Sequence, residues 1–361
     1  MIIPELPGYL ESIGGGEYKG LIIALFTLTA SISRPFSGRL TDTIGRIPVM
    51  VIGVGVCVIS SMAYPFATTL FGFFALRLLH GLSTGFKPTA TAAYVADIIP
   101  INKRGEAMGI FGTFGSAGMA FGPAMGSPIA QEFGMDWMFY ASAFLGGLSL
   151  LVLFKMPETL EDTVRFKASH LQLSLEDVFD RGVWFPGFLL VLTAFSFGLV
   201  LTVVPDYSDH LGLANRGVFF TVFTLSSILV RFLAGKASDK YGRLPVLMAS
   251  TSLMVVSLCL MAFAGTGTAL LVAGGVYGLA IGINSPTLYA YTVDLGDPNR
   301  KGRALATMYI MLEIGIGLGA LLGGWVHGNE TDNFPKTFLM PAVLSGLAGF
   351  LVIIRYRMVK Q

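Results

Sequence analysis

The sequence predicts an all-α membrane protein, from its composition, its apolar segments and an internal repeat. Hydrophobic residues make up 53% of the 361 residues, and only 13% are charged. Soluble domains carry about 25% charged residues, and a soluble protein of this length could not hide so much apolar surface in one core. The composition therefore excludes a disordered chain and argues against a soluble globular fold. A lipid bilayer is the solvent that fits it.

Eleven apolar segments have the length of a membrane-spanning helix. About 20 apolar residues are needed, because the bilayer core holds no water to bond to open backbone groups. The breaks between segments are short and polar or rich in turn-forming residues, as at 132–136 and 294–303. In chain order, the sequence predicts full spans at 19–38, 48–66, 70–97, 106–129, 137–155, 184–204, 217–236, 245–264, 268–293, 304–326 and 337–355.

The basic residues predict the orientation of these spans. If the loop after the first span is cytoplasmic, 17 of the 24 Lys and Arg residues lie in cytoplasmic segments, and only Lys19, Arg216 and Lys336 lie in loops on the other side. Such an excess marks the cytoplasmic side, so we expect a cytoplasmic C-terminus. The net charge is only +2, and we find no compact basic patch that would bind nucleic acid.

The chain repeats itself at a shift of 197 residues. Residues 38–48, Gly-Arg-Leu-Thr-Asp-Thr-Ile-Gly-Arg-Ile-Pro, return at 235–245 as Gly-Lys-Ala-Ser-Asp-Lys-Tyr-Gly-Arg-Leu-Pro. The repeat predicts two homologous halves. We expect an N-terminal bundle at 1–155, a cytoplasmic linker at 156–183 and a C-terminal bundle at 184–361. Within the linker, the amphipathic stretch 171–179 is either a solvated connector or a short helix on the membrane surface.

The repeat also predicts a helix ahead of the first full span. The second half opens with a complete span at 184–204 that ends at Pro205 and Tyr207, whereas its counterpart in the first half ends at Pro7 and Tyr9. We therefore expect the complete protein to have twelve spans and a cytoplasmic N-terminus. This chain is then a truncated product, or its start codon has been assigned too late. A nonfunctional fragment is the corresponding alternative.

Two six-helix halves with this loop motif resemble the major facilitator superfamily. The family's loop pattern G-x-L-x-D-x-x-G-R is matched by Gly38, Leu40, Asp42, Gly45 and Arg46, and the second copy keeps Gly235, Asp239, Gly242 and Arg243, with Ala237 in place of Leu. We expect a charged latch, in which Asp42 faces a positive helix N-terminus and Arg46 pairs with a carboxylate such as Asp97. Asp294 is the repeat equivalent of Asp97. The resemblance implies that this latch stabilises a state closed to the cytoplasm; the alternative is a loop whose charges only set the topology.

A second family motif, R-x-x-x-G, occurs in the fourth helix of the family. Arg77 and Gly81 match it, and His80 stands where the family often has Gln. The resemblance implies a role in proton coupling. An Arg that only bonds to neighbouring helices is an equal alternative, because an Arg within a span must be paired or hydrated.

A third family motif, G-x8-G-x3-G-P-x2-G, is typical of proton-coupled antiporters, particularly drug exporters. It is matched by Gly109, Gly118, Gly122, Pro123 and Gly126. Glycines at this spacing form a smooth ridge that allows close helix packing, and Gly315, Gly319 and Gly323 form a similar ridge in the second half. We expect the two ridges to be sliding surfaces between the halves; generic helix packing is the alternative.

Ionisable and polar residues inside the spans are the remaining site candidates. Glu313 lies about ten residues into its span and is our candidate proton carrier; a carboxylate held by Arg or Ser is the alternative. Lys87 precedes Pro88, and either bonds to the backbone carbonyl that Pro88 frees, or lines a cavity where it attracts an anionic substrate or pairs with Glu313. Glu5 is a candidate proton acceptor or helix cap, and Asn284 a weak substrate-site candidate.

These features predict a secondary transporter that works by alternating access. We expect proton-coupled export of small hydrophobic or amphipathic molecules, with the halves rocking about a central cavity; uptake or facilitated diffusion of a sugar or organic acid is the alternative. The four histidines are scattered, and no H-E-x-x-H, G-x-S-x-G or phosphate-binding loop occurs, so we expect neither an enzyme nor ATP drive. We expect no cofactor or metal, and a monomer in the bacterial inner membrane whose partners are lipid, substrate and proton.

Overall fold

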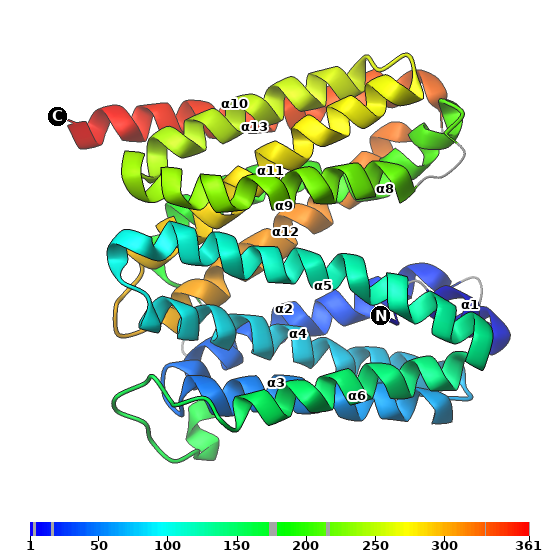
Figure 1. The fold of residues 1–361 in the computed structure, drawn as a ribbon, viewed down its shortest axis with the longest axis vertical. Helices are drawn as coiled ribbons and strands as arrows, with labels where there is room; N and C mark the ends of the chain where they lie inside the picture. Colours follow the sequence, from blue (N-terminus) through cyan, green and yellow to red (C-terminus); the bar gives the residue numbers. More distant parts are fainter. Residues whose placement is uncertain (3–4, 16–17, 173–178, 214–216, 329, 361) are drawn as a thin grey trace. The chain divides into compact units, whose positions relative to one another are not determined.

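The structure is a computed structural model that describes residues 1–361 except 3–4, 16–17, 173–178, 214–216, 329 and 361 (Figure 1). The described residues form helices and no strand. A short helix, α1, covers Leu6–Ser12. Eleven longer helices follow in the described part: α2 Lys19–Thr41, α3 Arg46–Ala63, α4 Leu70–Ile98, α5 Arg104–Phe133, α6 Met135–Leu153, α8 Trp184–His210, α9 Gly217–Tyr241, α10 Arg243–Ala262, α11 Gly267–Leu295, α12 Lys301–His327 and α13 Phe334–Lys360.

The all-α membrane fold is confirmed, and each of the eleven predicted spans coincides with one long helix. Seven described helices are apolar and long enough to cross a membrane by themselves, and a bent pair within α9 makes up to eight. Helices α2, α4 and α5 fall outside this set; α4, for example, carries Arg77, His80 and Lys87 in one helix. The number of spans therefore stays a prediction.

The chain folds into two compact units. Unit 1 contains residues 1–98, 117–180 and 297–309, and unit 2 contains 99–116, 181–296 and 310–361. The first turns of α12 thus belong to unit 1, and the first turns of α5 belong to unit 2. Each unit therefore combines helices of one sequence half with the start of a helix from the other half. The predicted bundle boundaries at 155 and 184 stay a prediction.

Unit 1 packs α2 and α3 against α4, and α3 against α6 (Figure 1). Its core near α1 is aromatic: the rings of Tyr64 and Phe139 stack with centroids 5.0 Å apart, and the Tyr9 hydroxyl donates to the Tyr64 carbonyl at 2.8 Å. The described part of the linker contains a short 3-10 helix at Ala168–Leu171. Most of the amphipathic stretch 171–179 lies outside the described residues.

Unit 2 repeats this arrangement. Helices α9 and α10 pack against α11, and α10 packs against α13. Under the 197-residue shift these are the equivalents of the unit 1 pairs, so the sequence repeat is also a repeat of helix packing. Unit 2 also contains α8, which packs against α13 and α11. Its Ser196 hydroxyl lies 2.7 Å from the hydroxyl of buried Tyr277.

Candidate functional site

The first loop motif holds the start of α12. Asp42, directly after α2, accepts hydrogen bonds from the backbone N–H groups of Gly302 at 2.8 Å and Arg303 at 2.9 Å. A carboxylate at a helix N-terminus is stabilised by the helix dipole and satisfies N–H groups that lack a partner within the helix. Arg46 bonds to Asp42 at 3.1 Å and to Asp97 at 2.9 Å. We name this cluster the first latch.

The second copy builds the same cluster on the start of α5. Asp239 accepts from the N–H groups of Gly105 at 2.8 Å and Glu106 at 2.9 Å. Arg243 bonds to Asp239 at 2.6 Å and to Asp294 at 2.8 Å. We name this cluster the second latch. Each latch lies within one compact unit, and each joins helices from both sequence halves.

Glycines make both latches possible. Gly45 and Gly242 have φ of +116° and +88°, a region that L side chains rarely adopt, and they turn the chain into α3 and α10. Gly38 and Gly302 let α2 meet α12, since a Cβ at Gly302 would lie 2.6 Å from the Gly38 carbonyl oxygen. In the second latch, a Cβ at Gly235 would lie 2.5 Å from the carbonyl oxygen of Gly105.

Four further latch residues, Lys301, Arg104, Glu158 and Thr159, were not predicted from the sequence. The first two are cations. Lys301 bonds to Asp97 at 2.8 Å, and its repeat equivalent Arg104 bonds to Asp294 at 2.9 Å. The repeat carried a signal for this pair, since both residues are basic and both directly precede the equivalent glycines Gly302 and Gly105. Each of them adds a cation to its latch and bonds to the same carboxylate as the Arg of the loop motif.

The segment after α6 also reaches the first latch. Glu158 accepts from the backbone N–H groups of Arg46 and Ile47, both at 2.9 Å, and so caps α3. The Thr159 hydroxyl donates to Asp97 at 2.7 Å. No spacing in the sequence indicates these two contacts, which depend on where the linker leaves α6.

An ion pair with Arg46 would by itself favour the charged form of Asp42. In the first latch, burial instead favours the neutral form. Burial raises the pKa of Asp42 to about 6, while Arg46 and the two N–H donors act in the opposite direction. Loss of hydration outweighs those favourable contacts here. Proton binding at Asp42 is therefore linked to closure of the first latch.

Arg77 is bonded to neutral groups of its neighbours. Its Nε donates to the Ile22 carbonyl at 2.9 Å, one terminal nitrogen donates to the Tyr64 hydroxyl at 3.1 Å, and the guanidinium lies over the Phe26 ring. The Tyr64 hydroxyl lies 3.4 Å from Nδ1 of His80. These contacts match the alternative of a structural Arg, and a coupling role stays a proposal.

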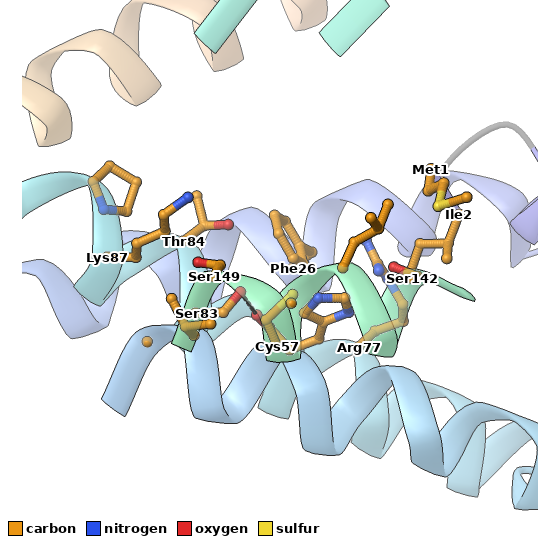
Figure 2. A pocket seen from close by; sticks show the side chains of 16 residues that line it. Met1, Ile2, Phe26, Cys57, Arg77, Ser83, Thr84, Lys87, Ser142 and Ser149 are labelled. Atoms are coloured by element: carbon orange, nitrogen blue, oxygen red, sulfur yellow. Dashed lines mark hydrogen bonds between the residues drawn. The ribbon is translucent and has the colours of Figure 1, made fainter. Parts of the chain in front are cut away.

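A cavity of about 490 Å³ in unit 1 is lined by residues of α3, α4 and α6, by Phe26 of α2 and by Met1 and Ile2 (Figure 2). Lys87 is exposed on its wall, and its ammonium group makes no hydrogen bond or ion pair within the described part of the chain. The expected bond from Lys87 to the backbone is therefore not observed. Its pairing with Glu313 would join residues of different units and stays a prediction.

The repeat shows what this cavity corresponds to in unit 2. Two of its residues, Cys57 and His80, are equivalent to Met254 and Tyr277 under the 197-residue shift. Both of those contact Ser196 of α8, at 3.6 and 2.7 Å. The cavity wall is thus the counterpart of a surface that seats a helix, so its volume alone does not identify a substrate site.

The glycine ridge of α12 packs within its own half. A Cβ at Gly315 would lie 2.7 Å from the Val191 carbonyl oxygen, and one at Gly323 would lie 2.8 Å from the Leu199 side chain. Gly319 approaches the backbone of Phe195. All three partners belong to α8. The expectation that this ridge slides against the other half is therefore wrong for its described contacts, because close packing onto α8 already uses it.

The antiporter-type motif in α5 is divided between the units. In unit 2, a Cβ at Gly109 would lie 2.7 Å from the Arg231 carbonyl oxygen. In unit 1, Gly122 and Gly126 lie against Met1, and Gly118 has open space beside it. Helix α5 continues through Pro123, whose side chain is outside the described residues.

The other candidates are placed separately. Asn284 is buried in α11 and donates to the Ser250 hydroxyl of α10 at 3.1 Å, which favours a structural tie. Glu313 is half-buried in α12, and Glu5 stands at the N-cap of α1 without a side-chain capping bond. Their roles stay proposals.

Comparison with known proteins places these features in a family. The family model described as Major Facilitator Superfamily matches residues 1–219 and 187–360. The chain is 28% identical over 371 residues to Multidrug resistance protein 2 of Bacillus subtilis, covering 98% of this chain and 88% of the relative. It is 26% identical to the multi-drug resistance efflux pump PmrA of Streptococcus pneumoniae, covering 91% and 85%.

Solved structures agree on the fold. The human organic anion transporter MFSD10 has a TM-score of 0.78 at 20% identity, and the proton:xylose symporter XylE has a TM-score of 0.80 at 15% identity. Each comparison covers 97% of this chain and 89% of the other. The chain is therefore a member of the major facilitator superfamily, a multi-pass membrane transport protein and not an enzyme.

Proposed function

We propose that this protein exports small hydrophobic or amphipathic molecules, and that protons moving inward drive the export. The observation that carries the proposal is its similarity to multidrug-resistance proteins, which extends over 91% or more of this chain. The glycine motif of α5 supports it, since the resemblance links that motif to proton-coupled antiporters.

The latches give the chain a means of closing one end of a substrate path. Asp42 ties the first sequence half to the start of α12, and Asp239 ties the second half to the start of α5. Opening to the cytoplasm requires both ties to break, which exposes four backbone N–H groups and two charge clusters to water. Hydration of the exposed groups offsets part of that cost, as an equilibrium between two states requires.

Glu313 is our proposed proton carrier. It is half-buried on a helix that crosses the membrane, where an ionisable residue is a functional candidate by default. Export then couples to protons if substrate and proton bind in alternation. Glu313→Gln keeps the size and polarity of the side chain but cannot release a proton.

Everted membrane vesicles from an efflux-deficient bacterial host test the proposal. With an acidic interior, we expect vesicles containing the protein to accumulate ethidium, and a protonophore to abolish the accumulation. Glu313→Gln is expected to remove the accumulation while the protein remains inserted, and Glu132→Gln, an exposed matched control, is expected to keep it. Ethidium entry that continues without the gradient and stops at equal concentrations on both sides would favour facilitated diffusion.

A further inference from the structure

The wall of the cavity of about 490 Å³ in unit 1 is chemically mixed (Figure 2). One part is apolar and includes Phe26, Val54 and Leu145. Another part is polar and includes Arg77, Lys87 and the hydroxyl groups of serine and threonine side chains. None of the described residues that line the cavity is an Asp or Glu. The wall thus offers cations and hydroxyl groups beside an apolar surface.

Lys87 stands in the middle part of α4, away from the acidic residues of unit 1 that lie outside the described part of the chain. Those acids are at positions 17, 176 and 177, next to Tyr18 and Gln172. Tyr18 packs against Phe74 near the start of α4, and Gln172 accepts from Arg39 near the end of α2. Lys87 follows Phe74 by thirteen residues, which is about 20 Å along a helix.

The repeat shows that the fold does not need a charge at this place. Under the 197-residue shift, Lys87 corresponds to Asn284 and Gly53 corresponds to Ser250. Asn284 is buried and donates to the Ser250 hydroxyl at 3.1 Å. Unit 1 cannot form this bond, because Gly53 has no side chain, and a Cβ there would lie 2.6 Å from the backbone nitrogen of Lys87. Unit 2 has a neutral tie between two helices where unit 1 has an exposed cation on a cavity wall.

Other cavity residues of α4 show the same contrast. The residues of unit 1 are Arg77, Ser83 and Thr84, and their equivalents in unit 2 are Gly274, Ala280 and Ile281. The side chains of Thr84 and Lys87 have no hydrogen-bonding partner among the described residues. An apolar helix seated on this wall would remove their water without giving them a partner, which is costly in a membrane. The polar wall therefore fits a ligand that carries polar groups.

Arg77 adds positive potential to the same cavity. Its described partners are a carbonyl oxygen, a hydroxyl group and an aromatic ring, so no described acid neutralises its charge. It precedes Lys87 by ten residues, which is about 15 Å along α4. Charges of one sign between walls of low dielectric constant attract an ion of the opposite sign. The electrostatics of the cavity therefore favour an anion.

We propose that this cavity binds a small amphipathic anion, with an aromatic or aliphatic body and one carboxylate. The carboxylate accepts a charge-assisted hydrogen bond from the Lys87 ammonium. Thr84, one turn earlier on the same face of α4, supplies a second donor. The body of the anion packs on the apolar part of the wall, as ligands of mixed polarity do in other pockets. The inference rests on the proposed export function and adds organic anions to the molecules exported.

Binding to the purified chain in neutral detergent tests this inference separately from export, because it needs no proton gradient. The probes are 2-naphthoate, 2-naphthamide and 2-naphthylmethylammonium, which share one ring system and differ in charge. Equilibrium dialysis at neutral pH gives the dissociation constants. We expect 2-naphthoate to bind about tenfold more tightly than the other two, because a hydrogen bond to a charged group contributes about this factor.

Variants of Lys87 assign the selectivity to its charge. Lys87→Met keeps the length of the side chain without the ammonium, and is expected to weaken 2-naphthoate binding about tenfold. Lys87→Arg is expected to retain most of the affinity. Lys155, an exposed Lys of unit 1 that does not line the cavity, provides the matched control. Lys155→Met should leave the affinity unchanged.

Cys57 reports where the anion binds, since it lines the cavity and the other cysteine can be removed by Cys259→Ser. In that background, we expect 2-naphthoate to slow the reaction of Cys57 with N-ethylmaleimide, and Lys87→Met to remove this protection. Equal affinities for the three probes, equal losses in Lys87→Met and Lys155→Met, or no protection of Cys57 would overturn the inference. Absence of ethidium export with this binding intact would overturn the proposed function alone.

Discussion

At the scale of single residues, the two latch aspartates occupy equivalent places and do a similar task. Each follows a helix, accepts two backbone N–H groups from another helix and pairs with an Arg four residues later. The chemistry is that of a helix cap supplied by a distant part of the chain. Such a cap holds two helices together through polar groups, and water can replace it when they separate.

The pKa of Asp42 predicts how acidity acts on the first latch. Its value of about 6 in the closed latch exceeds the ordinary 3.8, so the closed state binds the proton more tightly than a state in which water surrounds Asp42. Closure is therefore favoured as the pH falls through 6, and this contribution is lost as the pH rises above 6. From pH 7 to pH 5 we expect about a tenfold increase in the closed-to-open ratio.

Hydrogen exchange at the amides of Gly302 and Arg303 measures this effect, since both amides donate to Asp42. After correction for intrinsic exchange rates, their protection should rise on acidification. Asp42→Asn should remove the dependence, and Asp239→Asn should leave it in place. Protection that falls on acidification would contradict the assignment.

The residue scale also shows what the sequence could predict. The motif and its repeat predict that Asp42, Arg46 and Asp97 lie together, because helix ends and charge pairing follow local rules, and Arg46 forms ion pairs with both carboxylates. The contacts of Lys301 and Glu158 depend on tertiary packing between segments more than 100 residues apart, and no local pattern reports that. For Lys301, the only signal in the sequence was the repeat, which places the basic residue Arg104 at the equivalent position.

At the scale of helices, close approach depends on glycine. Gly302 lies where α12 meets α2, and a Cβ there would lie 2.6 Å from a backbone oxygen and 2.8 Å from the Thr41 Cβ. We predict that Gly302→Ala separates the two helix ends, because such overpacking costs about 1–3 kcal/mol. Ethidium export should fall accordingly.

Gly317, on the same helix, is the control for that substitution. Apart from its chain neighbours and the backbone of its own helix, no atom of the described residues lies within 4 Å of a Cβ at this position, and so Gly317→Ala should keep both export and thermal stability. If the two alanine variants behave alike, the close approach of α2 and α12 does not matter for function.

The start of α3 gives a further prediction for a single helix. Glu158 accepts the first N–H groups of α3, and its removal leaves them without that acceptor. Glu158→Ala should lower the free energy of unfolding by about 0.5–2 kcal/mol, as the loss of other helix caps does. Thermal unfolding in detergent measures this, with exposed Glu161→Ala as the control; an equal effect of both variants would exclude the cap.

The helix scale also marks where sequence reasoning stopped. Helix existence and order followed from apolar length, and the eleven expected spans are eleven long helices in the described chain. The helix that packs on a glycine ridge could not be predicted from the sequence, because the glycine pattern is the same whichever helix packs on it. The α12 ridge packs on α8 of its own half.

At the scale of the whole molecule, the two latches define one expected switch. Both must open before a path to the cytoplasm exists, and both are built from residues of each sequence half. We therefore expect them to open together, as one alternating-access transition, and not as two independent local events. A change that opens one latch should then loosen the other.

Amide exchange at the second latch of Gly302→Ala protein in lipid nanodiscs tests this claim most directly. The substitution acts on the first latch, while Gly105 and Glu106 report on the second through their bonds to Asp239. We predict faster exchange at Gly105 and Glu106 in Gly302→Ala than in wild-type or Gly317→Ala protein. Unchanged exchange at these two amides, with faster exchange at Arg303, would show that the latches open separately and would contradict the account.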